Sequence, residues 1–241
     1  MGQGFVYDGV DLGAYLKCNF ERPLAPPTSV ETLDVPGRDG AVFREARLEP
    51  LDIPVHVRLK PSGTDAAGLR HLLAPLLVKR EPKALVLPDE ALTYYAVLKG
   101  DSALDRLWTS GAADLVFHCP DPVAYGAVKT ATVPSGGSVT VTVGGNYPTS
   151  PTITAGAAVR NSSSLVWGVR LDGGDFVHVP TGSSSSRKVE VDCAAASCKV
   201  ANSIAMITLD SDWLELTPGQ HILKMDQGTG AATVKWIERW M

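Results

Sequence analysis

The sequence predicts a mainly β protein, with an α+β N-terminal domain of β-sheets and one helix at residues 1–128 and a β-sandwich or jelly roll at residues 129–241. Residues 51–60 alternate strictly between apolar and polar, which is typical of a half-buried strand. Leucines at helical spacing over 69–77 predict one amphipathic helix. The second half is punctuated by turn sequences about every ten residues, which favours a sandwich of short strands.

A strand is expected over 14–20, followed by a proline-rich loop. Residues 30–35 and 41–48 flank the sequence Gly-Arg-Asp-Gly at 37–40, whose glycines supply positive φ freely. This pattern predicts a hairpin. Pro54 lies within the alternating strand 51–60 and cannot donate to a ladder, so its N–H side is expected to face an edge or a bulge.

The single helix is expected to start at a cap provided by Thr64 or Asp65 and to run through Val78. Its leucine stripe, residues 69, 72, 73, 76 and 77, is interpreted as core packing against the sheet. One helix among many short strands indicates an α+β domain. The remaining strands of this half are expected at 84–87, 94–99, 104–108 and 112–118.

The composition changes near residues 126–132, where Thr, Ser, Gly, Val and Ala become abundant and charge becomes rare. The sequences DGGD, TGSSSS, TPGQ and DQGTG break this half into short segments. Strands are expected where Val133, Val139, Val141 and Val143 alternate with polar residues, and at 152–155, 165–171, 176–179, 188–192, 204–209, 213–216, 221–225 and 232–237.

The charge, hydropathy and cysteine content of the sequence argue against several classes of protein. The net charge of −4 argues against non-specific binding to nucleic acid. No apolar run is long enough to span a bilayer, and no secretory signal is evident, so no membrane insertion is expected. Four cysteines are too few for a disulfide scaffold. Cys193 and Cys198 are either free thiols or a local disulfide, and Cys18 and Cys119 are expected to be small buried groups in strands.

Motifs for catalysis are missing, so the sequence predicts no enzyme, no cofactor and no metal site. It contains neither a phosphate-binding glycine motif nor a Gly-x-Ser-x-Gly elbow. Cys119 and His118 are neighbours in a strand and point to opposite faces. The pairs Asp172/Asp175 and Asp210/Asp212 are interpreted as turn residues. The five histidines show no metal-ligand spacing.

Two kinds of binding residue are proposed instead. Charged residues in loops and turns are candidates for contacts between subunits: Arg22, Arg38, Asp39 and Asp121. Trp213 and Trp236 are candidates for stacking on a glycan, although core packing is the more common role of such tryptophans.

Several motifs occur in a characteristic order: FVYDGVD at 5–11, PGRDG at 36–40, PDEALTYYAVLKG at 88–100 and FHCPDPVAYG at 117–126. Together with the alternating strand and the leucine-striped helix, they resemble the distal tail proteins of siphoviruses, which are phages with long non-contractile tails. The resemblance covers about residues 1–128. GGNYPTSPTITAG at 144–156 and LTPGQHILKM at 216–225 are similar to the galectin-like sandwich of the same family.

The resemblance implies a structural virion protein at the distal end of the tail, made in the host cytoplasm. N-terminal domains would form a homohexameric ring around the tail channel, through which DNA passes without specific binding. The ring would join the tail tube protein to the tail-tip hub or tail-associated lysin protein. It would also anchor receptor-binding or side-fibre proteins in some members. To Val128 the sequence has 13 Lys and Arg against 17 Asp and Glu, a negative balance that suits such a channel.

Other functions stay open at this point. A carbohydrate-binding sandwich at 145–241, acting in adhesion to the host surface, is the first alternative. A jelly-roll hydrolase and a tail-tube or baseplate component of another injection machine are further alternatives.

Overall fold

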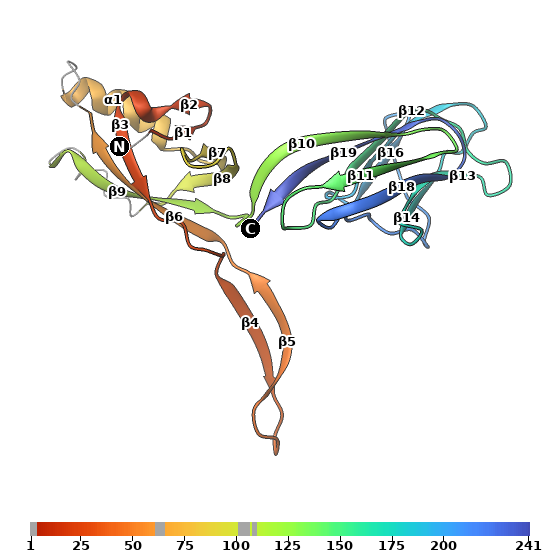
Figure 1. Cartoon of the computed structure of the whole chain (residues 1–241), viewed down its shortest axis with the longest axis horizontal. Helices are drawn as coiled ribbons and strands as arrows, with labels where there is room; N and C mark the ends of the chain where they lie inside the picture. The colour runs from red at the N-terminus through yellow and green to blue at the C-terminus, as the bar shows by residue number, and fades with distance from the viewer. Residues whose placement is uncertain (1–3, 61–65, 101–106, 108–109) are drawn as a thin grey trace. The chain divides into compact units, whose positions relative to one another are not determined.

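The computed structural model describes residues 4–60, 66–100, 107 and 110–241, and is mainly β (Figure 1). By its contacts the chain divides into two compact units. Unit 1 is Met1–Tyr125 with Met241, and unit 2 is Gly126–Trp240. The expected boundary after residue 128 falls inside strand β10. No helix in the described part of the chain is long and apolar enough to cross a membrane.

Unit 1 contains one antiparallel sheet in the order β2-β1-β7-β8-β9-β6-β3. Its strands are β1 (Val6–Tyr7), β2 (Val10–Asp11), β3 (Leu16–Phe20), β6 (Leu51–Leu59), β7 (Lys83–Val86), β8 (Thr93–Leu98) and β9 (Ala112–Cys119), with a 3-10 turn η1 (Leu12–Ala14). Strands β4 (Thr28–Asp34) and β5 (Ala41–Leu48) form a separate two-stranded hairpin. The hairpin predicted from the Gly-Arg-Asp-Gly turn is therefore confirmed.

Strand β6 is the strand that alternation identified, and it pairs with both β3 and β9. Every second residue of β6, from Leu51 to Val57, is buried. Pro54 lies beyond the end of β3, where its carbonyl oxygen accepts from the backbone N–H of Glu21 at 3.2 Å. A residue's N and O point to the same side of an antiparallel strand. The proline nitrogen therefore faces the side that β3 no longer covers, as expected for an edge.

The core of unit 1 lies between the curled sheet and helix α1 (Ala66–Leu77). Phe117 of β9 is fully buried, and its ring meets Phe5 and Tyr7 edge-to-face, with centroids 5.6 and 5.1 Å apart. Because β1 and β9 are not neighbours in the sheet, these contacts show that the sheet curls over its own core. Leu69, Leu73 and Leu77 of the helix are buried as predicted. Leu72, also assigned to that stripe, is 37% exposed.

Some expectations for this half need correction or cannot be compared. The β1–β2 hairpin turns through Asp8 and Gly9, both at positive φ, and was missed although Asp-Gly is a strong hairpin signal. The helix cap assigned to Thr64 or Asp65 lies outside the described residues. Most of the strand expected at 104–108 lies outside them as well, and its one described residue, Leu107, is helical, so the expectation of a strand is wrong there.

Unit 2 is a sandwich of two antiparallel sheets, ordered β17-β16-β15-β12-β19-β10 and β11-β18-β13-β14. The first sheet contains β10 (Ala124–Val133), β12 (Thr152–Ala158), β15 (Arg187–Asp192), β16 (Ser197–Val200), β17 (Ser203–Ala205) and β19 (Ala232–Trp240). The second contains β11 (Ser138–Val143), β13 (Val166–Leu171), β14 (Phe176–Pro180) and β18 (Gly219–Gln227). The inner faces of both sheets supply one core around Trp167.

Strand β10 begins at Ala124, earlier than the strand expected around Val133, and unit 2 departs from expectation in three further places. The segment 213–216 is not a strand; only Leu216 forms a bridge, to Thr149. Strand β16 was missed, and the strand expected at 204–209 is reduced to β17. Downstream of β17, the backbone N–H of Thr208 donates to His178 O at 3.0 Å, so this segment runs along β14 instead. Long-range pairing, which local pattern does not encode, decides these three cases.

All four cysteines are buried, and none of them forms a disulfide. Cys18 and Cys119 lie in β3 and β9, as predicted. Burial raises the pKa of Cys119 to about 12 and the pKa of Cys193 and of Cys198 to about 11. These thiols are therefore protonated at neutral pH, which is unfavourable for a nucleophile.

A histidine clamp holds the turn between β13 and β14. His221 Nδ1 lies 2.5 Å from Asp172 Oδ2, and His221 Nε2 lies 2.7 Å from Thr217 O. Both partners are acceptors, so this arrangement favours the charged imidazole, in which both ring nitrogens donate. Asp172, at φ 49°, also accepts from Ile222 N at 2.6 Å. The clamp thus fixes a residue in a left-handed conformation.

Replacing His221 by Gln is expected to lower the free energy of unfolding by roughly 1–2 kcal/mol at about pH 5. Burial lowers the pKa of His221, but its bonds to Asp172 and Thr217 outweigh this, so the pKa lies above its usual 6.5. Hydrogen bonding from His221 lowers the pKa of Asp172 below its usual 3.8. The histidine's contribution is therefore complete below pH 6.5 and is lost as pH rises through the folded pKa. The aspartate's contribution is complete above pH 3.8 and is lost as pH falls through its folded pKa.

Urea unfolding of wild type and His221→Gln across this pH range measures the effect. The difference between them should be largest between pH 3.8 and 6.5 and should shrink at higher pH. His71→Gln is the control, because His71 is exposed on α1. A difference that stays constant with pH would contradict the clamp.

Candidate assembly surface

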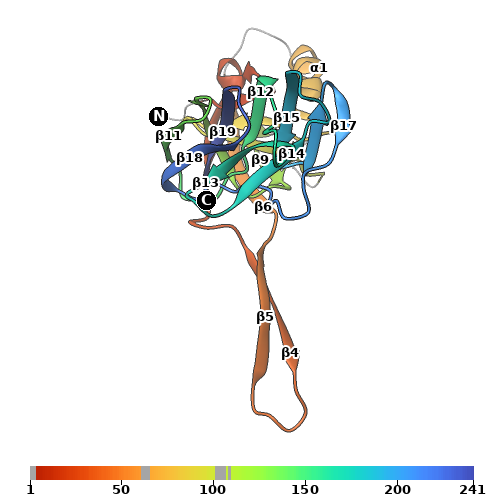
Figure 2. The same ribbon diagram turned by 90° about the vertical axis from the view of Figure 1, so that its right-hand side faces the viewer.

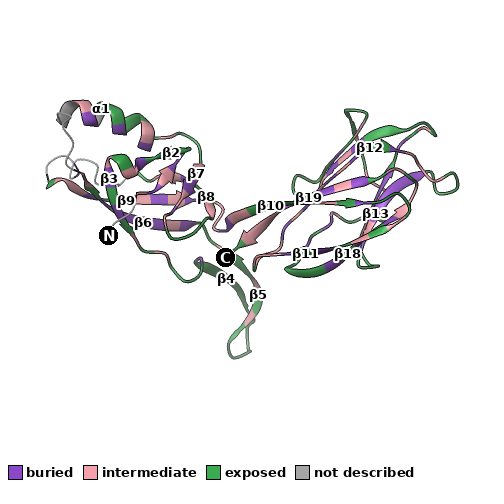
Figure 3. Cartoon of the chain, turned by 45° about the horizontal axis from the view of Figure 1, so that its top comes forward, coloured by how far each residue is buried: buried purple, intermediate pink, exposed green. Residues whose placement is uncertain are grey.

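The β4–β5 hairpin, residues 28–48, is called the arm from here on. Arg38 N donates to Val35 O at 3.1 Å, and Gly37 and Gly40 take φ of 80° and 76° at the tip. At the base, Glu49 N donates to Pro27 O at 2.8 Å. Figure 2 shows the arm as a two-stranded ribbon that extends from unit 1, and in the chain it follows β3 and precedes β6. Every residue of β4 is exposed (Figure 3).

The arm has an apolar face that nothing in the described chain covers. Directly opposed residues of an antiparallel pair share a face. The register pairs Val30 with Ala46 and Thr32 with Phe43, and Leu48 lies on the same face. Val30 is 58% and Phe43 is 63% exposed. Burying a side chain of this size contributes about 1.5–3 kcal/mol, so the face is suited to contact with another molecule.

The opposite face of the arm is charged near its middle. Arg44 pairs with Glu31, and Arg47 pairs with Glu45, each at 2.6 Å. Both pairs are well exposed, so each contributes little to stability. The arm is thus amphipathic, although a lone two-stranded ribbon is at best marginally stable in water.

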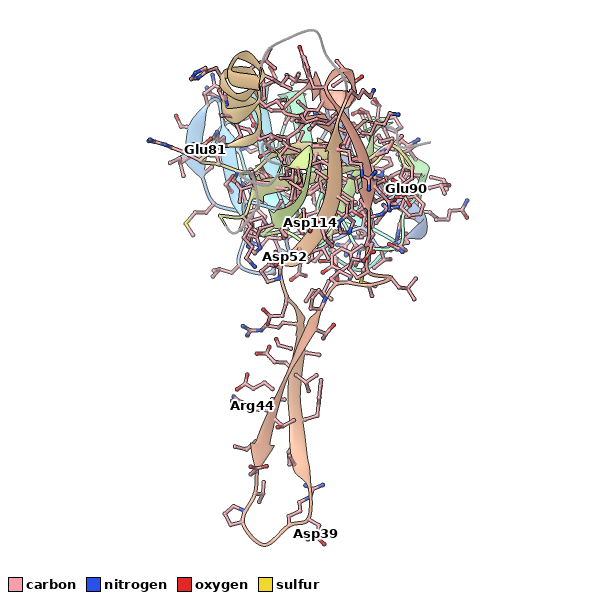
Figure 4. All side chains as sticks on the ribbon, turned by 90° about the vertical axis from the view of Figure 1, so that its left-hand side faces the viewer. Asp39, Arg44, Asp52, Glu81, Glu90 and Asp114 are labelled. Atoms are coloured by element: carbon pink, nitrogen blue, oxygen red, sulfur yellow. The ribbon has the colours of Figure 1, made fainter. Side chains whose placement is uncertain are left out.

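Arg38 and Asp39, two of the proposed contact residues, lie at the tip of the arm. Figure 4 shows Asp39 at the far end and Arg44 about half-way along. Both tip residues are exposed, and the described chain contains no ion pair to either. Their position leaves them available to a neighbouring subunit, so their role stays a prediction.

Arg22, a third proposed contact residue, is engaged within its own chain. Its guanidinium makes two 2.9 Å hydrogen bonds to Glu90 and a further ion pair with Asp89. The bonds to Glu90 raise the pKa of Arg22. The guanidinium also lies 5.8 Å from the ring of Phe20. These contacts tie the segment that leads into the arm to the loop after β7, so the structure favours an anchoring role over a contact between subunits.

Asp121 also has a local role. Its carboxylate accepts from Val123 N at 3.1 Å and from the Tyr125 hydroxyl at 2.5 Å. The Tyr125 ring in turn meets Tyr95 edge-to-face at 5.2 Å. Asp121 therefore stabilises the turn after β9, and the preference of Asp for bonding the backbone two residues ahead is the sequence signal for this role.

The two tryptophans proposed for glycan stacking lie in or against the core of unit 2. Trp236 is 4% exposed, so no face of its ring is available to a sugar. Trp213 is half-buried and packs against the same core. Core packing, the alternative considered for both residues, fits these positions.

The outer face of β3, β6 and β9 was not identified as a site from the sequence. It carries two cross-strand histidine–aspartate pairs: His56 with Asp114 at 2.5 Å, and His118 with Asp52 at 2.7 Å. Lys99 adds an ion pair to Asp52 at 2.8 Å and lowers the pKa of that carboxyl. A groove of about 470 Å³ lies on this face. The alternation within β6 indicated a solvated face, but only the register shows which charges meet across it.

Comparison with known proteins supports a tail function. The Phage tail protein RIFT-related domain family matches residues 7–119, and the Siphovirus-type tail component, C-terminal domain family matches residues 144–240. The chain belongs to the siphovirus distal tail family. Residues matched by the two domains cover nearly all of β1–β9 and β12–β19.

One curated relative of this siphovirus family is the distal tail protein of Bacillus phage SPP1, 25% identical over 98% of this chain and 95% of the relative. The crystal structure of SPP1 Dit, described as a paradigm of the hub adsorption apparatus in phages infecting Gram-positive bacteria, superposes with a TM-score of 0.75 at 22% identity. That match covers 99% of both chains and shows the same fold. The phage p2 baseplate matches with a TM-score of 0.45 at 9% identity, covering 91% of this chain and 90% of the other, which is too low to support a conclusion. The chain is a structural component of the phage tail.

Proposed function

We propose that this siphovirus tail protein forms a homohexameric ring at the distal tip of a long non-contractile tail, between the tail tube and the tail-tip hub. Unit 1 would form the ring around the channel, and unit 2 would be the module that meets other tail proteins. The protein acts through its surfaces and has no catalytic role in this proposal.

The observation that carries the proposal is the uncovered arm. Its apolar face, centred on Val30 and Phe43, is too exposed to be stable alone, and both of its strands present unpaired backbone groups at their outer edges. A neighbouring subunit would bury both. The arm and the body of unit 1 are different surfaces, and contacts between different surfaces generate rings when the rotation closes.

The charge of the first half suits a channel for DNA. Residues 1–128 have a balance of −4, which disfavours retention of a polyanion as it passes. The DNA would therefore cross the ring without specific binding.

The proposed partners of the protein follow from the proposed location of the ring in the tail. The proposed neighbours are the tail tube protein on one side and the hub or tail-associated lysin protein on the other, with receptor-binding or side-fibre proteins anchored to the ring. Description of the SPP1 relative as part of a hub adsorption apparatus supports this placement.

Electron microscopy of the purified chain, together with light scattering, tests the proposal. We expect six-fold rings with a central opening and a mass of six chains of 25.5 kDa. A species that stays monomeric at high concentration, or one that assembles into open filaments, would refute the ring.

A further inference from the structure

Two positive charges face each other on the outer surface of unit 1 without compensation. Lys17 of β3 lies directly opposite Arg58 of β6 in the register, and both side chains are exposed. Like charges directly opposite each other destabilise a sheet. The described chain contains no ion pair to either side chain, although the nearby carboxylate of Asp114 lies 2.5 Å from His56. The Lys17–Arg58 pair therefore has the character of a site for a carboxylate from outside the chain.

The pair borders the groove on this face. The groove measures about 470 Å³, and its lining includes Lys17, Asn19, His56, Arg58, Ala112 and Asp114. Asp114 and Asp52 mark this face of the sheet in Figure 4. Lys17 and Arg58 outnumber Asp114 in this lining, so the groove can receive a narrow ribbon of net negative charge.

The tip half of the arm carries a net negative charge, because Asp34 and Asp39 outnumber Arg38. Glu31 and Glu45 are already paired with arginines of the arm. Asp34 and Asp39 are exposed, and the described chain contains no ion pair to either. They are therefore the carboxylates of the arm that are available to an external cation.

Because the arm extends away from the groove of its own chain, this contact involves another copy of the chain. The arm continues from Phe20, the last residue of β3, and returns at Leu51, the first residue of β6. Lys17 and Arg58 lie toward the opposite ends of those strands. At about 3.3 Å per residue, the seven residues of β4 carry the tip about 23 Å beyond the base, away from the chain's own basic pair.

We propose that the arm of one subunit lies in the groove of the next, with Asp34 and Asp39 at its tip facing the Lys17–Arg58 pair. The contact is head-to-tail, because arm and groove are different surfaces of the same chain. This inference rests on the proposed ring and identifies the surfaces that close it. The apolar face of the arm supplies contact area, and the charges set the register and exclude wrong pairings.

A charge-swap experiment on the full chain tests the contact. The groove variant carries Lys17→Glu and Arg58→Glu, and the arm variant carries Asp34→Lys and Asp39→Lys. In each variant alone, every arm meets a groove of like charge. Each is expected to be monomeric in analytical ultracentrifugation at concentrations where the wild type is fully assembled.

An equal mixture of the two variants should assemble again. A wild-type arm then meets a wild-type groove, and a reversed arm meets a reversed groove, at alternating positions. Such alternation closes in a ring with an even number of subunits, as in a hexamer. Mass photometry should show rings of wild-type mass, and native mass spectrometry should show equal numbers of the two chains.

The outcomes distinguish a failure of the arm–groove contact from a failure of the proposed ring. Arg80→Glu, a charge reversal at another exposed position of unit 1, is the control and should assemble normally. Circular dichroism and thermal melting of each variant show whether it is folded.

If the wild type forms rings and both variants also form them, the arm–groove contact is refuted while the ring stands. If both variants are folded and monomeric but the mixture fails to assemble, the proposed pairing is refuted. A wild type that never assembles refutes the ring and the contact together.

Discussion

A chain whose arm is replaced by a two-residue turn is expected to fold normally and to lose assembly completely. Replacing residues 28–48 by Asn-Gly removes β4 and β5, and Pro27 O and Glu49 N already lie 2.8 Å apart, so a tight turn can join them. The core of unit 1 contains no residue of the arm, so the free energy of unfolding should change little. The apolar face that requires a neighbour disappears with the arm.

Light scattering over a wide range of concentrations measures the loss. The matched control replaces Gly182–Ser186 in unit 2 by Asn-Gly, which shortens another connection between strands and should leave assembly intact. Rings formed by the armless chain would show that the contacts holding the subunits together lie elsewhere.

The second large effect concerns the two separate cores. Phe117→Ala is expected to destabilise unit 1 by roughly 3–5 kcal/mol, because it removes a fully buried ring and its contacts with Phe5 and Tyr7. Trp167→Ala should destabilise unit 2 by a similar amount, since Trp167 is fully buried in the other core. Each core consists of residues from its own unit, so each loss should stay within that unit.

Hydrogen exchange followed by mass spectrometry locates the effect of each substitution. Phe117→Ala should speed exchange in peptides from β6 and β9 and leave those from β12 and β19 unchanged. Trp167→Ala should do the reverse, so each variant is the control for the other. Equal acceleration in both units by either variant would show that the units unfold as one.

Where local pattern and long-range packing agree, prediction from sequence succeeded. Strand β6 was visible because alternate burial leaves a period of two in the sequence. The arm was visible because its tip requires glycines at positive φ. Strand β16 and the loop at 213–216 were not recognisable in the sequence, because distant partners decide whether such short segments pair.

The residues proposed for the assembly surface also divide into those that local pattern places correctly and those that it does not. Arg38 and Asp39 were correctly placed in a tight turn, since turn chemistry is local. Arg22 had the character of a surface residue in the sequence, but folding brings the distant Glu90 to it and satisfies it internally. The partners of Asp121, Val123 and Tyr125, are its near neighbours in the sequence, so this turn was a local signal that was missed. Trp236 was a candidate for glycan stacking in the sequence, but its side of β19 faces the core.

The sequence by itself determined the mainly β class, the amphipathic helix at 66–77, the arm and the tail family, because these depend on periodicity, turn residues and the order of motifs. Only the tertiary structure decided which charges are satisfied within the chain and which have no ion pair in its described part. Lys17 and Arg58 are 41 positions apart (58 − 17), and only the register of β3 against β6 shows that they meet. The physical reason is that electrostatic compensation depends on distance in space, which a linear pattern does not record.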